Sequence, residues 1–329
     1  MDMDISCTCG KDCIESSAKV MKSLNIHYLP CKNCDTDDLE KFRPLNEQVE
    51  LNDINDRWKS CPCGRRHLDH VMAHILMIMM EEKLRDGNST LRQVGTPLLT
   101  IGCPLKGPPY LLKDSMVLLT DHINKKCSLR VYEEVPEVKG VLKGDMRVTV
   151  GLKDSESLPN TYQLMAGCDL RCDILETPSG QIYIYKNQGQ IHLEFPKPLN
   201  PKITALYKTF NKYQNPSILD CTCGPGTLGI FALKAGARKV VFNDIWYPAA
   251  EMTAINLEVN GFPVNFLKQE PGLIAEGENF QVYCTDIRDL KSFLDEKFDI
   301  GVIDPFPGVD FTELSHSVRE MCHEVIIIQ

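Results

Sequence analysis

The chain has 329 residues, of which 43% are hydrophobic and 25% are charged, and this ordinary globular composition excludes a mainly disordered protein. The 36 basic and 45 acidic residues give a net charge of −9, so we expect no domain-wide basic surface for binding nucleic acid. No apolar run reaches the ~18–20 residues of a membrane span, and the N-terminus lacks the features of a secretory signal. We therefore expect a cytoplasmic protein that does not bind membranes.

Cysteine is concentrated near the N-terminus, where seven of the 15 cysteines lie within the first 63 residues. They form the clusters Cys7-x-Cys9-x₃-Cys13, Cys31-x₂-Cys34 and Cys61-x-Cys63. A structural zinc ion needs four thiolate or imidazole ligands, so we predict a Zn²⁺ site formed by Cys31, Cys34, Cys61 and Cys63. Free thiols and an iron–sulfur cluster are the alternatives. Three nearby histidines are further candidate ligands or ordinary core or surface side chains: His67, His70 and His74.

The first 200 residues divide into two predicted regions. Residues 1–93 form a Cys-rich module that ends in a helix from about Arg66 to Arg85, closed by Gly87-Asn88. Residues 94–200 form a strand-rich α+β middle region. Its β-prone runs are Ser115–Thr120, Ser128–Val135, Val138–Leu142, Arg147–Leu152, Ile174–Glu176, Gln181–Lys186 and Gln190–Phe195. The proline-punctuated segment Pro196–Pro201 marks the boundary to the next domain.

Residues 201–329 alternate between helical and strand-like segments. The predicted strands are Ser217–Asp220, Lys239–Asn243, Gln281–Thr285, Asp299–Ile303 and Val325–Ile328. The predicted helices are Lys202–Gln214, Thr227–Ala235, Pro248–Asn260, Leu290–Leu294 and Phe311–Cys322. Strand–helix alternation with Val- and Ile-rich strands predicts a parallel α/β sheet of the Rossmann-like kind.

The carboxyl ends of these strands, where such sheets bind ligands, carry glycines and acidic residues. The loop after the first strand contains Gly224 and Gly226, which permit positive φ and close approach of a ligand. The second strand is followed by Asp244, about 20 positions after the loop, where an acid can accept hydrogen bonds from ribose hydroxyls. The third strand ends at Asp286, for which a helix N-cap is the alternative role, and the fourth at Asp304-Pro305-Phe306.

This set of residues resembles class I S-adenosylmethionine-dependent methyltransferases over about residues 216–329. The resemblance implies that Asp220, Gly224 and Gly226 hold the methionine part of the cofactor. It also implies that Asp244 binds the ribose and that Asp286 reaches the adenine amine. Asp304, Pro305 and Phe306 match the catalytic motif beside the transferable methyl group.

A narrower likeness concerns the segments Asn243-Asp244, Ala249 or Ala250, Asn256–Gly261 and the later Asp-Pro-Phe. They are similar to segments of tRNA guanine methyltransferases of the dimethylguanosine type and their RNA-modifying relatives. In this chain Pro307 stands where that pattern has glycine.

We predict a methyltransferase whose first 200 residues recognise a macromolecule. The acidic balance narrowly favours a protein side chain as the substrate. The alternatives are a tRNA guanine N-methyltransferase, a small-molecule methyltransferase and a non-enzymatic zinc-binding partner protein. The Asp304 carboxylate is suited to orient an amine and the Phe306 ring to stack on a planar target, which favours N-methylation.

The end of the sheet leads to a further expectation. The last predicted strand, within Val325–Gln329, is apolar, and an open apolar edge invites aggregation. We expect the N-terminal regions to dock on the methyltransferase domain, with the middle region between Ser115 and Phe195 covering this edge. A dimer partner is the alternative cover.

Overall fold

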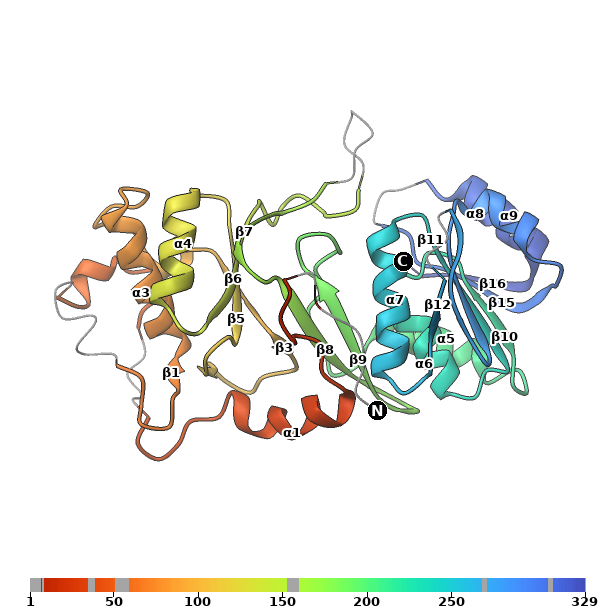
Figure 1. Cartoon of the computed structure of the whole chain (residues 1–329), viewed down its shortest axis with the longest axis horizontal. Helices are drawn as coiled ribbons and strands as arrows, with labels where there is room; N and C mark the ends of the chain where they lie inside the picture. Colours follow the sequence, from red (N-terminus) through yellow and green to blue (C-terminus); the bar gives the residue numbers. More distant parts are fainter. Residues whose placement is uncertain are drawn as a thin grey trace.

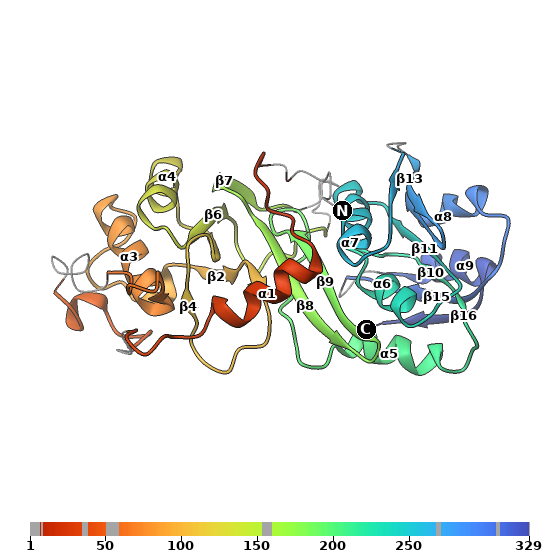
Figure 2. The same cartoon turned by 60° about the horizontal axis from the view of Figure 1, so that its bottom comes forward.

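The computed structural model describes residues 7, 9–34, 39–50, 59–152, 160–267, 271–306 and 310–328. The molecule is elongated, with residues 59–93 and the C-terminal domain at opposite ends, while the described start of the chain lies near the centre (Figure 1). A long hairpin lies between them in both views (Figure 2). Among the described residues, no helix is both long and apolar enough to cross a membrane.

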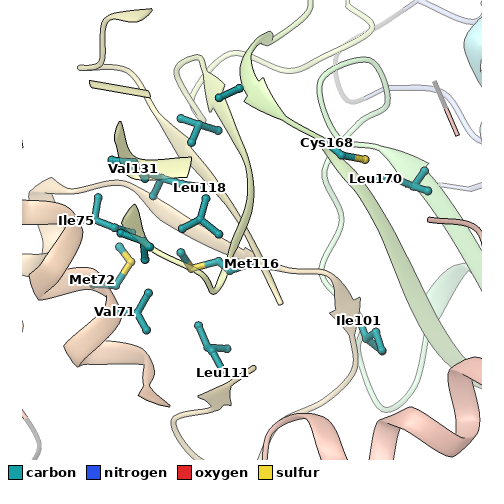
Figure 3. Packing of buried hydrophobic residues seen from close by; sticks show 14 of the residues in the cluster. Val71, Met72, Ile75, Ile101, Leu111, Met116, Leu118, Val131, Cys168 and Leu170 are labelled. Carbon is teal, nitrogen blue, oxygen red and sulfur yellow. The ribbon is translucent and has the colours of Figure 1, made fainter. Parts of the chain in front are cut away.

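The N-terminal module is built around one buried helix, α3 (Leu68–Glu81). Its sequence is almost continuously apolar, and ten of its residues are buried. It packs in one core with strands of the middle region (Figure 3). The other elements in the described part of this module are α1 (Ser17–His27), η1 (Leu45–Glu47), β1 (Arg66–His67) and η3 (Leu91–Gln93), and β1 is antiparallel to β4 (Tyr110–Leu111). The predicted helix of this region is confirmed, with tighter limits.

The middle region contains a four-stranded sheet in the order β2-β5-β6-β7. Its strands are β2 (Thr96–Leu99), β5 (Met116–Thr120), β6 (Val138–Lys143) and β7 (Gln163–Gly167). The prediction of a strand at Ser128–Val135 is wrong, because helix α4 (Lys125–Glu134) occupies it and connects two parallel strands. The Asn124 side chain caps this helix by accepting a hydrogen bond from the Cys127 N–H.

Two other predicted strands of the middle region are absent from the described chain. The segments Arg147–Leu152 and Gln190–Phe195 are turns and irregular backbone. Both segments instead contribute residues that approach the candidate site described below. Val150 and Ile191 are buried, but Val148 and Phe195 are exposed, and neither segment pairs with a strand among the described residues.

The predicted hairpin is confirmed as β8 (Leu170–Thr177) and β9 (Gly180–Asn187), which pair along their whole length. The short β3 (Ile101–Gly102) pairs with β8 to make a three-stranded sheet. Strand β9 of the hairpin contacts helices α6 and α7 of the C-terminal domain. The hairpin is therefore the main link between the two ends of the molecule (Figure 1).

The C-terminal domain holds a seven-stranded sheet in the order β12-β13-β14-β11-β10-β15-β16. The five predicted strands correspond to β10 (Ser217–Asp220), β11 (Lys239–Asp244), β14 (Phe280–Cys284), β15 (Phe298–Ile303) and β16 (Cys322–Ile327). These five are mutually parallel, as predicted. Two unpredicted antiparallel strands extend the β14 edge: β12 (Asn265–Phe266) and β13 (Gly272–Gly277).

Helices accompany the parallel strands of this domain. They are α5 (Pro201–Phe210), α6 (Thr227–Lys234), α7 (Tyr247–Val259), α8 (Ile287–Leu290) with η4 (Lys291–Phe293), and α9 (Thr312–Met321). Asn200 caps α5 by accepting from two backbone N–H groups, and Pro201 occupies the first turn. These features explain why the chain starts a helix directly after the proline-rich boundary.

The prediction that the middle region covers the last strand is wrong. Within the described residues β16 pairs with β15 only, and the hairpin packs on α6 and α7. Glu324 on β16 instead bonds to Lys212 and Tyr213, which follow α5. A charged residue with local partners reduces the tendency of an edge strand to pair with another chain.

Candidate functional site

The glycine-rich loop between β10 and α6 has the left-handed backbone that its glycines permit. Gly224 has a φ of +53° and Gly226, the N-cap of α6, has a φ of +86°. A Cβ added at Gly224 would meet no atom within 4 Å, whereas one at Gly226 would press against Thr253. The backbone at Gly224 therefore borders open space that a ligand can approach closely.

Asp220 closes strand β10 beneath this loop and is buried. Its Oδ2 accepts a hydrogen bond of 2.9 Å from the Gly229 N–H, and its Oδ1 has no partner among the described residues. Burial raises the pKa of Asp220 to about 7. A buried carboxylate oxygen without a partner fits a site for a polar or cationic ligand group, which agrees with the cofactor role predicted for Asp220.

Asp244 and Asn243 connect the loop to the neighbouring strand ends. Asp244 accepts hydrogen bonds of 2.9 Å from the N–H groups of Gly224 and Trp246, and burial raises its pKa. The buried Asn243 amide donates to the carbonyls of Cys221 and Thr285. The carboxyl ends of β10, β11 and β14 are thereby held together, and each Asp244 oxygen retains capacity to accept from a hydroxyl.

Asp286 lies at the carboxyl end of β14, where the sequence places it. It caps α8 by accepting from the Arg288 N–H, and it forms a 2.5 Å ion pair with the Arg288 guanidinium. The helix-cap role left open at the sequence level is thus present. A contact with adenine remains a prediction.

Asp304 follows β15 and is paired with a lysine from the domain boundary. Its Oδ2 lies 2.7 Å from Nζ of Lys202, and its N–H donates to Thr222 Oγ1 in the glycine loop. Burial raises the pKa of Asp304, and the Lys202 ammonium partly opposes this effect. Asp304 is therefore tied to the glycine loop through its backbone N–H and to a cation through its carboxylate.

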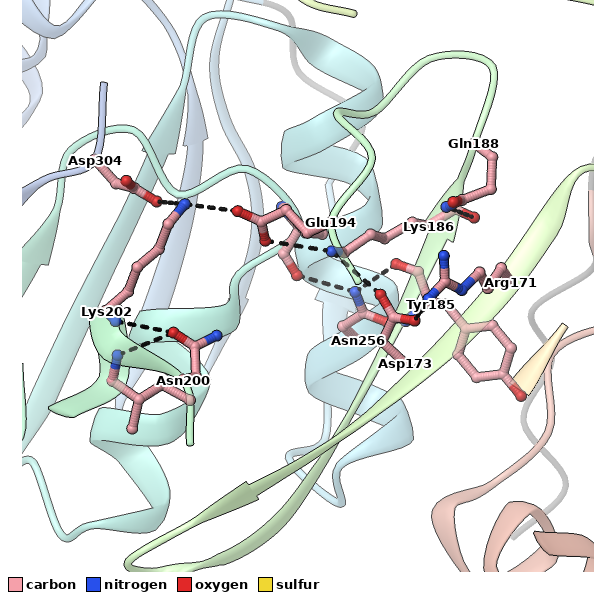
Figure 4. Close-up of polar contacts among 12 residues, drawn as sticks. Arg171, Asp173, Tyr185, Lys186, Gln188, Glu194, Asn200, Lys202, Asn256 and Asp304 are labelled. Atoms are coloured by element: carbon pink, nitrogen blue, oxygen red, sulfur yellow. Dashed lines mark hydrogen bonds and ion pairs between the residues drawn. The ribbon is translucent and has the colours of Figure 1, made fainter. Parts of the chain in front are cut away.

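A chain of ion pairs extends from Asp304 into the middle region (Figure 4). Lys202 also contacts Glu194 at 2.6 Å, and Glu194 lies 3.6 Å from the buried Lys186. Burial alone would raise the pKa of Glu194, but the two lysines outweigh it and lower that pKa to about 2. The chain ends at a buried pair of opposite charges, Arg171 and Asp173, with Asp173 also 3.3 Å from Lys186.

Phe306 is partly buried and lies against two residues of the middle region. The His192 ring meets it edge to face with centroids 5.5 Å apart, and a Cβ added at Gly151 would lie 2.7 Å from its ring. Burial lowers the pKa of His192, which favours its neutral form. Pro307, which departs from the resembled pattern, lies outside the described residues.

The structure brings Gly224, Asp244 and Asp304 to one edge of the sheet, as their positions after β10, β11 and β15 require. Sequence reasoning missed Lys202, Glu194, His192 and Gly151 as neighbours of this edge. The only sequence signal for them was their nearness to the boundary Pro196–Pro201 or their place in β-prone runs.

The four cysteines predicted to bind zinc lie together. The Sγ atoms of Cys31, Cys34, Cys61 and Cys63 all lie within 4.8 Å of one another. Individual Sγ–Sγ distances are 3.5–3.7 Å, and two backbone N–H groups point at sulfur in this cluster. With Zn–S bonds of about 2.3 Å, a tetrahedral ion needs sulfurs about 3.8 Å apart, so these residues fit zinc.

The histidines considered as extra zinc ligands are not part of this cluster. His74 Nδ1 lies 3.1 Å from the guanidinium of Arg66, which pairs with the buried Glu137. Burial lowers the pKa of His74 to about 4. The His67 ring caps α3 by accepting from the Asp69 N–H. His67, His70 and His74 are buried, and none of them belongs to a group of possible metal ligands in the part of the chain that the structure describes.

Comparisons with known proteins match the C-terminal domain. A family model described as ribosomal protein L11 methyltransferase (PrmA) matches residues 203–287. The ribosomal protein L11 methyltransferase of Shewanella piezotolerans is 35% identical over 94 residues, which cover 27% of this chain and 32% of that protein. The ribosomal RNA large subunit methyltransferase I of Vibrio campbellii is 27% identical over 169 residues, covering 48% of this chain and 37% of that protein.

The chain therefore spans about a third of the length of these curated relatives. Among solved structures, the M. jannaschii tRNA m1G37 methyltransferase aligns with 64% of this chain and 56% of its own. Its identity is 16% and its TM-score 0.37, a score too low to carry a conclusion. The parallel strands in the order β14-β11-β10-β15-β16, the glycine loop and the family match together identify residues 201–329 as a class I S-adenosylmethionine-dependent methyltransferase domain.

Proposed function

We propose that the chain transfers a methyl group from S-adenosylmethionine to a nitrogen atom of RNA. The observation that carries this proposal is the position of Asp304. It lies beside the glycine loop, it is paired with Lys202, and the adjoining Phe306 contacts His192 of the middle region. A site shaped by two domains suits a macromolecular substrate held by the first 200 residues.

The residues of the C-terminal domain have distinct tasks in this proposal. Asp220 and the loop at Gly224 and Gly226 hold the methionine part of the cofactor, Asp244 holds the ribose, and Asp286 faces the adenine. When bound, S-adenosylmethionine supplies a methyl group carried on a sulfonium sulfur, which leaves as a thioether. The protein's main contribution is to place the accepting nitrogen in line with that methyl group and to exclude water.

Asp304 acts on the accepting nitrogen. Its carboxylate accepts a hydrogen bond from the N–H of the base and takes the proton as the nitrogen forms its new bond to carbon. Lys202 opposes the rise in the pKa of Asp304 that burial causes, and so preserves the ionised form. The ring of Phe306 stacks on the base, with His192 fixing its edge.

The relatives support RNA over the protein side chain that the acidic composition favours. The match to the Vibrio campbellii RNA methyltransferase covers 48% of the chain, about 158 residues, and the C-terminal domain has only 129. That similarity therefore extends upstream into the region that encloses Phe306. The match to the ribosomal protein methyltransferase covers only 27% of the chain, which is less than the length of the domain.

A cavity in the middle region also suits RNA. Its volume is about 510 Å³, and its lining includes the buried Arg171 and the exposed Phe195. The Arg171 guanidinium lies 5.4 Å from the Phe195 ring centroid, and its Nε and Nη1 have no hydrogen-bond partner among the described residues. The exposed Phe195 ring can stack on an RNA base, and the buried Arg171 guanidinium, already paired with Asp173, lies behind that ring.

The experiment that tests this function supplies the full-length protein with methyl-labelled S-adenosylmethionine. The acceptors are total RNA and total protein from a strain that lacks the gene, and Asp304→Ala is the matched control. We expect label in a nuclease-sensitive, protease-resistant fraction, and only with the wild-type protein. Label in protein alone would contradict the RNA assignment, and no label in either fraction would contradict a macromolecular methyltransferase.

We also propose that Cys31, Cys34, Cys61 and Cys63 hold a structural Zn²⁺ ion in the N-terminal module. The support is the four-sulfur geometry, in which all four Sγ atoms lie within 4.8 Å of one another. Zinc analysis of the purified protein and of Cys34→Ser tests this site, and an unchanged zinc content in a folded variant would contradict it.

A further inference from the structure

A second group of four cysteines is separate from the first and combines residues from distant parts of the sequence. Cys7, Cys9 and Cys13 come from the segment before α1. Cys168 lies at the corner between β7 and β8, where Figure 3 labels it. All four Sγ atoms lie within 4.8 Å of one another. Cys7 and Cys168 are separated by 161 positions in the sequence, so no local pattern could reveal the set.

The distances in this group fit a single tetrahedral ion. Sγ of Cys7 is 3.6 Å from Sγ of Cys168, and Sγ of Cys9 is 3.5 Å from Sγ of Cys13. A tetrahedron with Zn–S bonds of about 2.3 Å has edges of about 3.8 Å. A disulfide would need sulfurs about 2.05 Å apart, and the cysteines of a multi-iron cluster are held farther apart by the cluster itself.

The surroundings suit a site of net negative charge. Four thiolates around Zn²⁺ carry a charge of −2 in total. The Lys139 ammonium acts electrostatically on Cys13 and Cys168, and the Lys139 carbonyl accepts the Cys168 N–H at 2.9 Å. The turn at Gly10, with a φ of +74°, folds the chain back so that three cysteines of one short segment face one point.

Packing alone explains this group poorly. Single buried cysteines behave as small apolar side chains, and Cys127 and Cys172 do so in the described part of this chain. In the second group, however, Cys9 and Cys13 are only partly buried, so apolar burial does not account for their position. We infer that Cys7, Cys9, Cys13 and Cys168 bind a second structural Zn²⁺ ion.

This second ion has a defined structural task. It fastens the segment before α1 to the start of β8. The same segment continues to Glu15, whose backbone N–H donates to the Tyr185 hydroxyl on β9 at 3.0 Å. The backbone of Tyr185 in turn bonds to the Asn256 amide on α7. The ion therefore holds the segment before α1 against the hairpin that contacts the methyltransferase domain. This structural role does not depend on methyl transfer.

The test is the metal content of the full-length protein, measured by inductively coupled plasma mass spectrometry. We expect two zinc ions per chain in the wild type, one in Cys168→Ser, one in Cys34→Ser, and none in the double variant. Cys103→Ser is the matched control, because Cys103 is partly buried but belongs to neither group, and it should keep two ions. One zinc ion in the wild type that persists in Cys168→Ser would overturn the inference, as would iron in place of zinc.

A second variant covers the case in which Cys168→Ser does not fold. Cys9 is partly exposed, so Cys9→Ser removes a ligand with less disturbance of the core. In protein reconstituted with Co²⁺, the thiolate-to-cobalt absorption should fall by about half in this variant. Unchanged absorption in a folded Cys9→Ser protein would contradict the second site.

Discussion

Asp304 and Lys202 form the ion pair on which the proposed chemistry depends. Burial by itself lowers the pKa of Lys202, but the carboxylates of Glu194 and Asp304 outweigh it and raise that pKa. The lysine is therefore a stable cation, and it holds one oxygen of Asp304 in place. The other oxygen of Asp304, Oδ1, is the atom assigned to the methyl-accepting nitrogen.

Replacing Asp304 should separate catalysis from cofactor binding. Loss of a positioned general base lowers rates by about 10²–10⁴-fold, so Asp304→Ala should reduce single-turnover methylation by that order. The affinity for S-adenosylmethionine should change little, because the proposed partner of Asp304 is the accepting nitrogen. Calorimetry and a single-turnover assay measure the two quantities, and equal losses in both would make Asp304 a cofactor or structural residue.

Replacing Lys202 should change the pH dependence of the reaction. Asp304 must be ionised to accept a proton, and Lys202 lowers its pKa against the effect of burial. In Lys202→Met the pKa of Asp304 rises further, so the acidic limb of the kcat/KM profile should move to higher pH. Lys202→Arg keeps the charge and should keep the limb near its wild-type position. A lower rate at every pH with no displacement of the limb would contradict this role.

At the scale of elements, the contact between α7 and β9 decides how the two halves of the molecule meet. The side-chain amides of Asn256 and Asn260 bond to the backbone N–H and carbonyl groups of Tyr185 and Tyr183, as a neighbouring strand would. Asn256 also donates to the carbonyl of Pro225 in the glycine loop. One residue thus connects the cofactor loop to the hairpin.

The two asparagines give a matched pair of variants. Asn260→Ala and Asn256→Ala each leave two backbone groups of β9 without their partners, which should reduce the free energy of unfolding by about 1–3 kcal/mol. Only Asn256→Ala should also weaken S-adenosylmethionine binding, because only Asn256 holds Pro225. Denaturant unfolding and calorimetry measure these effects. Equal cofactor affinity in both variants would show that the Pro225 contact does not support the loop.

The elements that the sequence predicted well are those with strong local signals. The parallel strands carry near-continuous Val and Ile runs, and the hairpin has Thr-Pro-Ser-Gly at its turn. The segment Ser128–Val135 was misjudged because its Val and Tyr residues favour strands, whereas the Asn124 cap and the buried Cys127 and Val131 stabilise a helix. Strands β12 and β13 are short or glycine-bounded and gave no clear pattern.

The candidate site shows the same division between local and long-range information. Asp244 and Asp304 could be found because each directly follows a recognisable strand. His192, Gly151 and Cys168 could not, because packing between distant segments brings them to Phe306 or to the N-terminal cysteines. Asp286 had two candidate roles in the sequence, and the structure provides the partner for the helix-cap role.

At the scale of the whole molecule, one hydrophobic core crosses the boundary between the regions. It contains Cys7 and Val20 from the N-terminal segment, Tyr183 and Tyr185 from the hairpin, and Met252, Ile255 and Val259 from α7. Because these side chains share one core, loosening the N-terminal segment should affect the helix that flanks the cofactor loop.

Metal removal should therefore lower the melting temperature of the main unfolding transition. Zinc binding to the folded state adds to its stability, and a strong chelator removes that contribution. The control is the same chelator saturated with zinc, which should leave the transition unchanged. Calorimetric scans with and without S-adenosylmethionine measure the effect. Two separate transitions, with the cofactor-sensitive one unaffected by the chelator, would contradict a shared core.

The most direct test of the account is calorimetric titration of the full-length protein with S-adenosylmethionine. We predict one binding site per chain. In Asp244→Ala the affinity should fall roughly 10- to 100-fold, because a hydrogen bond to a charged group contributes about 1.5–3 kcal/mol. Asp304→Ala should bind nearly as well as the wild type. Absence of binding by the wild-type protein, or unchanged affinity in a folded Asp244→Ala variant, would contradict the proposed cofactor site.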